Sequence, residues 1–152
     1  MELQKRKSTR IPNFDYSRNN YYFITVCTHQ KNCIFGSVAR RNHFGKIAKD
    51  EIEKIPAFYK GVYLDSYIIM PNHIHAIIVL DGAEKSISEI IGSYKAGVTR
   101  EIRKSKPKMI VWQRSFHDHI IRNERQYQKI WQYVRNNDQK WEEDCHYIEC
   151  TE

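Results

Sequence analysis

The sequence predicts an α+β fold: a ferredoxin-like antiparallel sheet with helices on one face, followed by a C-terminal tyrosine-bearing helix. Three observations predict it. Strand and helix patterns follow one another in the order β-α-β-β-α-β-α, the helix starts carry capping residues, and no shift in composition marks a second domain. We therefore interpret residues 1–152 as a single domain, with a basic arm over residues 1–20 and a polar tail over residues 138–152.

Four strands are expected. Three segments have the β-branched and aromatic composition of strands: residues 21–28 (YYFITVCT), 63–70 (YLDSYIIM) and 73–80 (HIHAIIVL). Pro71 and Asn72 form a turn between the last two segments, and Asp81 with Gly82 ends the third. A fourth strand is expected within residues 111–122.

Three helices are expected, and each follows a residue suited to cap its first turn. Asn42 precedes an amphipathic segment that should end near Pro56. Ser86 and Glu89 have the spacing of a capping box, and a long helix follows them with apolar residues on one face. Asn123 precedes the last helix, residues 124–136.

The charge of the chain favours a nucleic-acid partner. The 152 residues carry a formal net charge of +7, from 25 Lys and Arg against 18 Asp and Glu. The 10 Tyr and 3 Trp add groups on which unpaired bases can stack. No apolar run approaches the roughly 20 residues that span a bilayer, so we expect a cytoplasmic protein with no membrane partner.

The cysteines give a weaker signal. Cys27, Cys33, Cys145 and Cys150 form no C-x-x-C pair, and no secretory segment precedes them. We expect free thiols, as in cytoplasmic proteins generally. A zinc site of Cys145, His146 and Cys150 is the alternative, but its spacing is poor and a fourth ligand is not obvious.

The sharpest local feature is the pair His73 and His75 in the run MPNHIHAII. Because side chains alternate between the faces of a strand, both imidazoles project to one face and Ile74 to the other. Two imidazoles on a rigid strand form a ready pair of metal ligands. Packing or surface histidines are the alternative, although two polar rings are costly to bury in so apolar a strand.

Around these histidines the chain resembles a known family. The run YIIMPNHIHAIIV resembles the His-hydrophobic-His (HUH) motif of single-tyrosine transposases, above all the REP-associated tyrosine transposases and relatives in small bacterial insertion sequences. YYFITVCTHQKNCIFG resembles the family's first strand and loop, and WQRSFHDHIIRNERQYQKIWQYVRNN its last strand and tyrosine-bearing helix. The resemblance covers most of residues 16–141 and implies one HUH transposase-like domain.

The resemblance implies a site and a reaction. His73 and His75 would hold Mg²⁺ or Mn²⁺, Tyr133 would be the nucleophile, and Asn137, one helical turn later, a third ligand. The family often continues with Asn-Pro, whereas this chain reads Asn136, Asn137, Asp138. The expected activity is cleavage and rejoining of single-stranded or hairpin DNA through a 5′-phosphotyrosyl intermediate, by a homodimer.

Several residues have more than one interpretation. Tyr127 and Tyr147 are rival nucleophiles. His119, in HDHIIRN, resembles a recurring family position and could lie near the active site, contact DNA, or be structural. Basic residues in and after the long helix and in the arm are expected to contact phosphates, or else to form a solvated surface: Lys95, Arg100, Arg103 and Arg10.

Three other functions stay open at this point. A replication-initiator-like nickase could use the same motif, although the short chain argues against a large relaxase. A domesticated, non-catalytic DNA-binding protein could keep the fold without the reaction. A metalloprotein unrelated to nucleic acid would leave the basic charge without a role.

Overall fold

The computed structural model describes residues 20–148 and residue 150, and its centre is a four-stranded antiparallel sheet. The strands are β1 (Asn20–Cys27), β2 (Val62–Met70), β3 (His73–Leu80) and β4 (His117–Ile121). They lie in the order β2-β3-β1-β4, so β3 and β1 are the central pair. This order confirms the predicted ferredoxin-like sheet, and the third strand has the predicted bounds.

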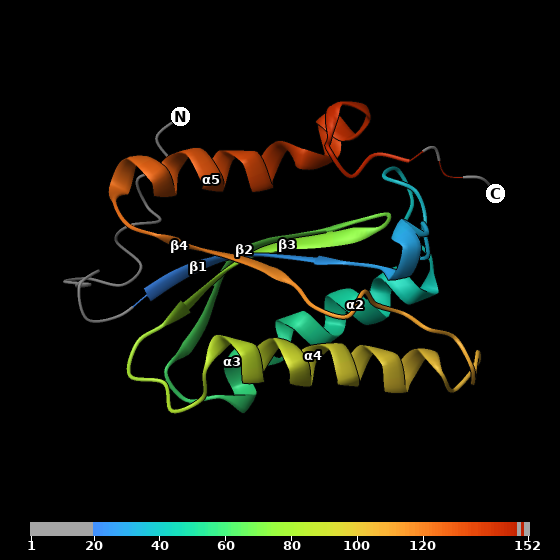
Figure 1. Ribbon diagram of the computed structural model, residues 1–152, viewed down its shortest axis with the longest axis horizontal. Coiled ribbons are helices and arrows are strands. Elements are labelled where there is room, and N and C mark those ends of the chain that lie inside the picture. Colours follow the sequence, from blue (N-terminus) through green and yellow to red (C-terminus); the bar gives the residue numbers. More distant parts are fainter. Residues whose placement is uncertain (1–19, 149, 151–152) are drawn as a thin grey trace.

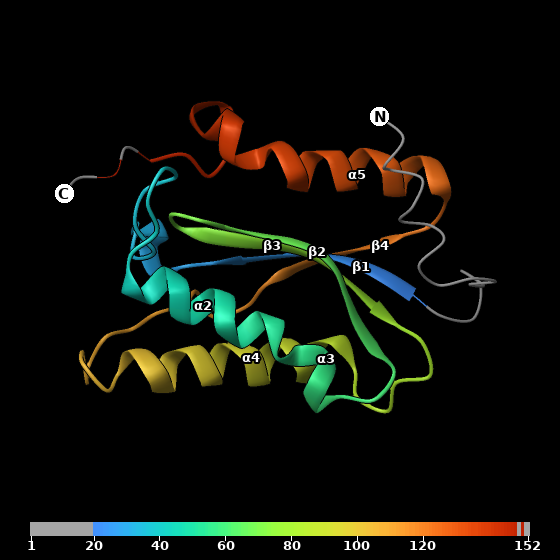
Figure 2. The same cartoon turned by 180° about the vertical axis from the view of Figure 1, so that it is seen from behind.

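Helices cover both faces of the sheet (Figures 1 and 2). One face carries α2 (His43–Glu53), α3 (Ile55–Phe58) and α4 (Ile87–Ile102), and the other carries α5 (Glu124–Asn136). Short 3-10 helices, η1 (His29–Lys31) and η2 (Asn137–Glu143), follow β1 and α5. No helix within residues 20–148 combines the length and apolar character needed to cross a membrane.

The predicted caps are present. The Asn42 side chain accepts a hydrogen bond from the Gly45 amide, and the Asn123 side chain accepts one from the Gln126 amide. Ser86 and Glu89 form the reciprocal capping box at the start of α4. Each cap satisfies backbone N–H groups that the first turn of a helix leaves without partners.

Alternation along β3 divides the interior into two clusters. Ile74, Ala76 and Ile78 pack toward α2 and α4, whereas Ile77 and Val79 pack toward α5. Residues of α5 complete the second cluster, and the largest of them, Trp131, is almost fully buried with 4% of its surface exposed. Because side chains alternate along β3, the two clusters determine the face on which each side chain lies. Both histidines therefore lie on the face toward α5.

A β-bulge in β2 helps to hold α5. The register with β3 shifts between Leu64 and Ser66, which leaves Asp65 as the extra residue. Its carboxylate accepts a hydrogen bond of 2.6 Å from the Tyr127 hydroxyl. Tyr127 is fully buried and also meets the Tyr21 ring edge to face, at 5.5 Å between centroids.

The polar tail predicted over residues 138–152 includes η2 and packs against the sheet in its described part. After η2 the chain turns back and reaches the start of β3, where the Asn72 amide donates to the His146 carbonyl at 2.9 Å. The expectation of free thiols is wrong for two cysteines. Cys33 and Cys150 form a disulfide, because this return brings residues 117 positions apart to a Cα–Cα distance of 5.7 Å. Cys27 and Cys145 are free.

The packing of α5 yields a stability prediction. Replacing Trp131 with Ala should lower the free energy of unfolding by about 3–5 kcal/mol, because it leaves a cavity between α5 and the sheet. Its exposed neighbour is the control: Gln132→Ala should change stability by less than about 0.5 kcal/mol. Urea unfolding measures both, and equal effects of the two substitutions would contradict the described packing of α5.

Candidate metal and tyrosine site

His73 and His75 lie at the start of β3 and face α5 and the returning chain. They are 0% and 2% exposed, and their ring centroids are 4.6 Å apart. β3 is paired on both sides, with Met70 and Cys27 opposite His73 and with Ile68 and Thr25 opposite His75. The ladder therefore sets the separation of the two imidazoles, as the alternation of the strand predicts.

Asn72 fixes the tautomer of His73. Its amide nitrogen donates to the carbonyls of Lys31 at 3.1 Å and His146 at 2.9 Å, so its oxygen must face the other way. That oxygen lies 2.8 Å from Nδ1 of His73, and therefore accepts a hydrogen bond from it. Nδ1 carries the proton in the neutral ring, which leaves the lone pair of Nε2 free for a ligand.

His75 is oriented in a similar way. Its Nδ1 lies 3.0 Å from the hydroxyl of Thr25, its neighbour across the sheet. Burial, followed by the adjacent His73, lowers the pKa of His75 well below its ordinary value. Burial likewise lowers the pKa of His73 to about 4, against the opposing effect of Asp144. Both rings are neutral at pH 7 and can act as ligands.

Three buried polar side-chain atoms near each other have no hydrogen-bond partner within the described part of the chain. They are Nε2 of His73, Nε2 of His75 and Oδ1 of Asn137. A buried polar atom left unpaired costs about 1–3 kcal/mol, so three at one place need a physical reason. Two neutral imidazoles and an amide oxygen are ligands that a divalent cation accepts, and the residues therefore fit a metal ion.

A carboxylate joins this group. Oδ2 of Asp144 lies 3.7 Å from Nε2 of His73, and ligand atoms of His73, His75 and Asp144 all lie within 4.8 Å of one another. Burial alone would raise the pKa of Asp144, but hydrogen bonds from the His146 amide and the Asn137 side chain hold it below its ordinary value. Asp144 is thus a charged oxygen donor beside the two rings.

Tyr133 reaches the same place from α5. Its ring centroid lies 5.1 Å from that of His75 and 6.1 Å from that of Phe23. The side chain is 42% exposed, so a substrate can approach it. Burial, followed by the carboxylate of Asp144, raises the pKa of Tyr133 to about 12. Asn137 follows one turn later with helical backbone angles (φ −61°, ψ −37°), so the departure from Asn-Pro does not break the turn.

The rival tyrosines make other contacts, although Tyr147 is also near the site, because the ring of its partner Trp141 lies 6.1 Å from that of His73. Tyr127 is buried against Asp65, and Tyr147 packs on Trp141 at 5.1 Å between ring centroids. Beside Tyr133 a cavity of about 370 Å³ opens between α5 and η2. Two of its lining residues are basic and several can donate hydrogen bonds; the lining is Lys129, Gln132, Tyr133, Asn136, Asn137, Lys140, Glu143 and Asp144.

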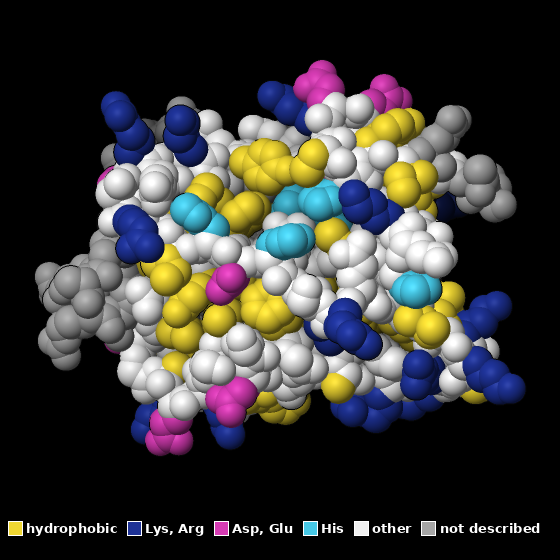
Figure 3. Space-filling model, viewed as in Figure 1, with side chains coloured by type: hydrophobic (Ala, Val, Ile, Leu, Met, Phe, Trp, Pro, Cys, Tyr) yellow, Lys and Arg dark blue, Asp and Glu magenta, His cyan; other side chains and the backbone are white. Residues whose placement is uncertain are grey.

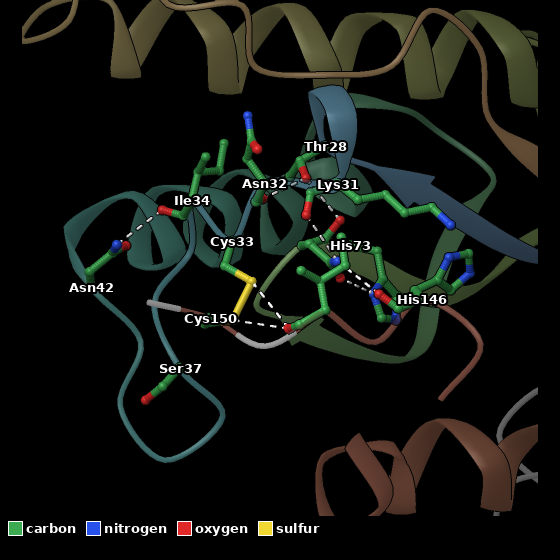
Figure 4. The surroundings of a disulfide bond; sticks show 12 residues. Thr28, Lys31, Asn32, Cys33, Ile34, Ser37, Asn42, His73, His146 and Cys150 are labelled. Carbon is green, nitrogen blue, oxygen red and sulfur yellow. Dashed lines mark hydrogen bonds between the residues drawn. A yellow bond between two sulfur atoms is a disulfide. The ribbon is translucent and has the colours of Figure 1, made fainter. Parts of the chain in front are cut away.

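Asp144 and His146 are absent from the sequence-based site. The run Asp144, Cys145, His146 was visible in the sequence, but it suggested only a cysteine-based zinc site. Its place beside His73 depends on the return of the chain after η2. His146 meets His73 at 4.6 Å between ring centroids, and Figure 4 shows these two residues together, close to the disulfide of Cys33 and Cys150.

The other predicted residues are spread over the surface. His119, in β4, lies opposite Phe23 of β1 and is exposed. It is on the same face of the sheet as His75, with β1 between their two strands. Histidines occupy the band between α5 and the α4 layer, while Lys and Arg gather over the end of α4 and the following loop (Figure 3). Arg100 and Arg103 belong to this end of α4, and Arg103 also donates to the Met109 carbonyl.

Two of the residues predicted to contact DNA are Lys95 and Arg10. The ammonium group of Lys95 donates to the carbonyls of Gln113, Arg114 and Ser115 at 2.8–3.5 Å, so it holds the loop before β4. Arg10 and Tyr16 lie outside the described residues. Tyr16 and Tyr21 are the tyrosines of the arm region that were expected to stack on bases; Tyr21 is 1% exposed, so this expectation is wrong for Tyr21.

The buried histidines predict a pH dependence of stability in the metal-free protein. Between pH 6.5, the ordinary histidine pKa, and pH 4, the unfolded chain binds a proton at His73 that the folded chain does not bind. Stability should therefore fall as the pH falls through this window, by about 2 kcal/mol at pH 5 relative to pH 7.

Urea unfolding in the presence of a chelator measures this slope. The slope should become smaller in His73→Asn and stay unchanged in His43→Ala, which removes an exposed histidine at the start of α2. An unchanged slope in His73→Asn would show that His73 is not held neutral by burial.

Comparisons with known proteins identify the family and the fold. Residues 15–137 match the family of IS200-like transposases. The chain is 34% identical to an uncharacterized protein of Haemophilus influenzae over 172 aligned positions, which cover 97% of this chain and 96% of that protein.

Two solved structures share the fold. One is a REP-associated tyrosine transposase bound to a REP hairpin, with a TM-score of 0.65, 20% identity, and coverage of 80% of this chain and 67% of that one. The other, from Deinococcus radiodurans R1, is described as a candidate transposase, with a TM-score of 0.57, 18% identity, and coverage of 82% and 93%. By its match over most of its length, this chain belongs to the IS200-like transposase family.

Proposed function

We propose that this protein cleaves and rejoins single-stranded DNA, with Tyr133 as nucleophile and a divalent cation held by His73 and His75. One observation carries the proposal: the bare Nε2 atoms of two buried imidazoles meet a half-exposed phenol within one site, at 5.1 Å between the rings of His75 and Tyr133. Membership of the transposase family supports the same reaction.

Four donors would hold the cation: Nε2 of His73, Nε2 of His75, Oδ1 of Asn137 and Oδ2 of Asp144. Two nitrogen and two oxygen atoms suit Mn²⁺ or Mg²⁺, with Mn²⁺ the better match to imidazole. When bound, the cation would polarise the phosphoryl oxygens and offset the negative charge that develops during attack.

Tyr133 would form the covalent intermediate. Its hydroxyl oxygen bonds to phosphorus while the bond from phosphorus to the 3′ oxygen breaks, which gives a 5′-phosphotyrosyl linkage and a free 3′-OH that takes up a proton. A second 3′-OH can reverse the step on another strand, so rejoining needs no ATP. The pKa of about 12 disfavours the phenolate, partly because of Asp144. A cation bound to that carboxylate would offset its charge and so favour loss of the phenol proton.

The DNA strand would pass beside α5. The cavity next to Tyr133 carries Lys129 and Lys140, and positive charge there would attract the phosphates on either side of the bond to be cut. We further propose that Arg100, Arg103 and Lys95 in α4, with Arg10 in the arm, contact DNA phosphates. For Lys95 this contact would compete with its three carbonyl partners.

The proposed substrate is single-stranded DNA that forms a hairpin, and the proposed assembly is a homodimer. A fold relative was solved with a REP hairpin, which supports the first of these. The dimer rests on the family resemblance alone. A non-catalytic DNA-binding protein is the alternative function, and the covalent adduct described next separates the two.

The nucleophile prediction is tested with labelled hairpin-bearing single strands and Mn²⁺. A covalent protein–DNA adduct should form with the wild type, vanish in Tyr133→Phe, and fall by at least about tenfold in His73→Ala and His75→Ala. The matched control is Tyr147→Phe, which removes a phenol of similar exposure and should leave the adduct unchanged. An adduct that survives Tyr133→Phe would move the nucleophile elsewhere, and DNA binding without any adduct would favour the non-catalytic function.

Metal binding should also stabilise the fold without DNA. Mn²⁺ at 100 times its dissociation constant should add about 2.7 kcal/mol to the free energy of unfolding. This increase should disappear in His73→Ala and His75→Ala but persist in His43→Ala. Thermal melts with and without Mn²⁺ measure it, and stabilisation that survives both site substitutions would place the ion at another site.

A further inference from the structure

A second set of metal-ligating atoms lies next to the first. Ligand atoms of Asp144, Cys145 and His146 all fall within 4.8 Å of one another. A fourth donor comes from β1, because Sγ of Cys27 lies 3.8 Å from Nδ1 of His146. The proposed reaction uses neither thiol and assigns no role to the imidazole of His146.

The membership of this set differs from the zinc site that the sequence suggests. Cys150 is paired with Cys33 and has no free thiol, so it cannot be the third ligand. The fold supplies two replacements, Asp144 from the same turn and Cys27 from the end of β1. A carboxylate, an imidazole and two thiols complete a set of four, which is the usual number of ligands at a structural zinc ion.

We propose that Cys27, Asp144, Cys145 and His146 form a second metal site, selective for a thiophilic cation such as Zn²⁺. Thiolate ligands select Zn²⁺ over Mg²⁺ and Mn²⁺, whereas the nitrogen and oxygen donors of the first group do not exclude those harder ions. The two sites are therefore distinguished by their sulfur content. This proposal does not depend on the DNA-cleaving function.

Asp144 can serve both sites because its two oxygens face different partners. Oδ2 accepts from the Asn137 amide at 2.8 Å and lies on the side of His73. Oδ1 accepts from the backbone amide of His146 at 2.8 Å, a residue of the second set. A bridging carboxylate between neighbouring cations is a common arrangement in two-metal sites. A zinc ion in the second site would then help to set the position of the Asp144 carboxylate in the first site.

The segment that carries these ligands is held by contacts independent of a metal. The Asn72 amide fixes the His146 carbonyl, and the disulfide from Cys33 to Cys150 fixes the chain four residues later (Figure 4). Cys27 is 3% exposed and rigid within the sheet, while Cys145 is exposed. A cation can therefore enter from the side of Cys145 and meet the mutually close donors of Asp144, Cys145 and His146, with Cys27 reached through its contact with His146.

Co²⁺ is the probe that tests this site, because cobalt bound to thiolate gives a near-ultraviolet charge-transfer band that nitrogen and oxygen ligands do not give. The titration uses the full chain, as wild type with its disulfide intact and no reductant, and with Cys33→Ser and Cys150→Ser combined under a phosphine reductant. That double variant keeps only two of the four cysteines, Cys27 and Cys145. We expect one equivalent of band-forming Co²⁺ in both proteins, displaced by Zn²⁺ but not by Mg²⁺.

Single substitutions in the double variant assign the ligands. Cys145→Ser, at an exposed position, should abolish the band or reduce it to less than half, and His146→Ala should weaken Co²⁺ affinity at least about tenfold. His73→Ala is the control and should keep the band.

Three results would overturn the proposal: no band in the wild type, a band of full intensity in Cys145→Ser, or a band lost in His73→Ala. The last would mean that one ion, held by the histidine pair, touches the thiol. Circular dichroism of each variant separates ligand loss from unfolding, and the DNA adduct assay reports separately on the cleavage function.

Discussion

The site depends on the pairing of β3 with strands on both of its sides. A register shift of one residue would turn both imidazoles toward α2 and α4, because side chains alternate at every position. The observed register places Thr25 opposite His75 and Cys27 opposite His73, and the hydrophobic residues of β3 sort to two separate clusters. The same packing that stabilises the domain therefore holds the two ligands on the face that α5 covers.

The two faces of the sheet have different roles. The face toward α2 and α4 is filled with apolar side chains and gives the domain most of its core. The face toward α5 is apolar along most of α5, but near the start of β3 it changes to histidines, Asn137 and Asp144. The long packed helix α5 brings Tyr133 to this polar end, and Tyr127 anchors the other part of the helix through Asp65. A rigid helix and a rigid strand thus carry the phenol and the imidazoles.

Local sequence patterns were enough to predict most of the secondary structure and the relation of the site residues within each element. The third strand and the last helix have the predicted bounds, because a run of apolar residues, a Pro-Asn turn and an Asn cap act over a few neighbouring positions. The pairing of His73 with His75 follows from strand alternation, and the relation of Tyr133 to Asn137 follows from one helical turn.

Contacts between distant segments could not be predicted in this way. Asp144 and His146 reach His73 only because the chain turns back after η2 to the start of β3, and no spacing in the sequence encodes that turn. The disulfide between Cys33 and Cys150, 117 residues apart, depends on the same return. The family resemblance could indicate the histidines and the tyrosine but could not indicate the tail, which lies beyond the matched residues 15–137.

The proposed chemistry requires one cation to bind between the imidazoles of His73 and His75 and within reach of the Tyr133 phenol. An anomalous difference map from a crystal of the protein soaked in Mn²⁺ tests it most directly. We expect one strong peak about 2.0–2.3 Å from Nε2 of both His73 and His75, at the usual length of metal–nitrogen bonds, on the side of the sheet that carries α5. A peak bound by only one of the two rings, or a manganese ion found only away from them, would contradict it.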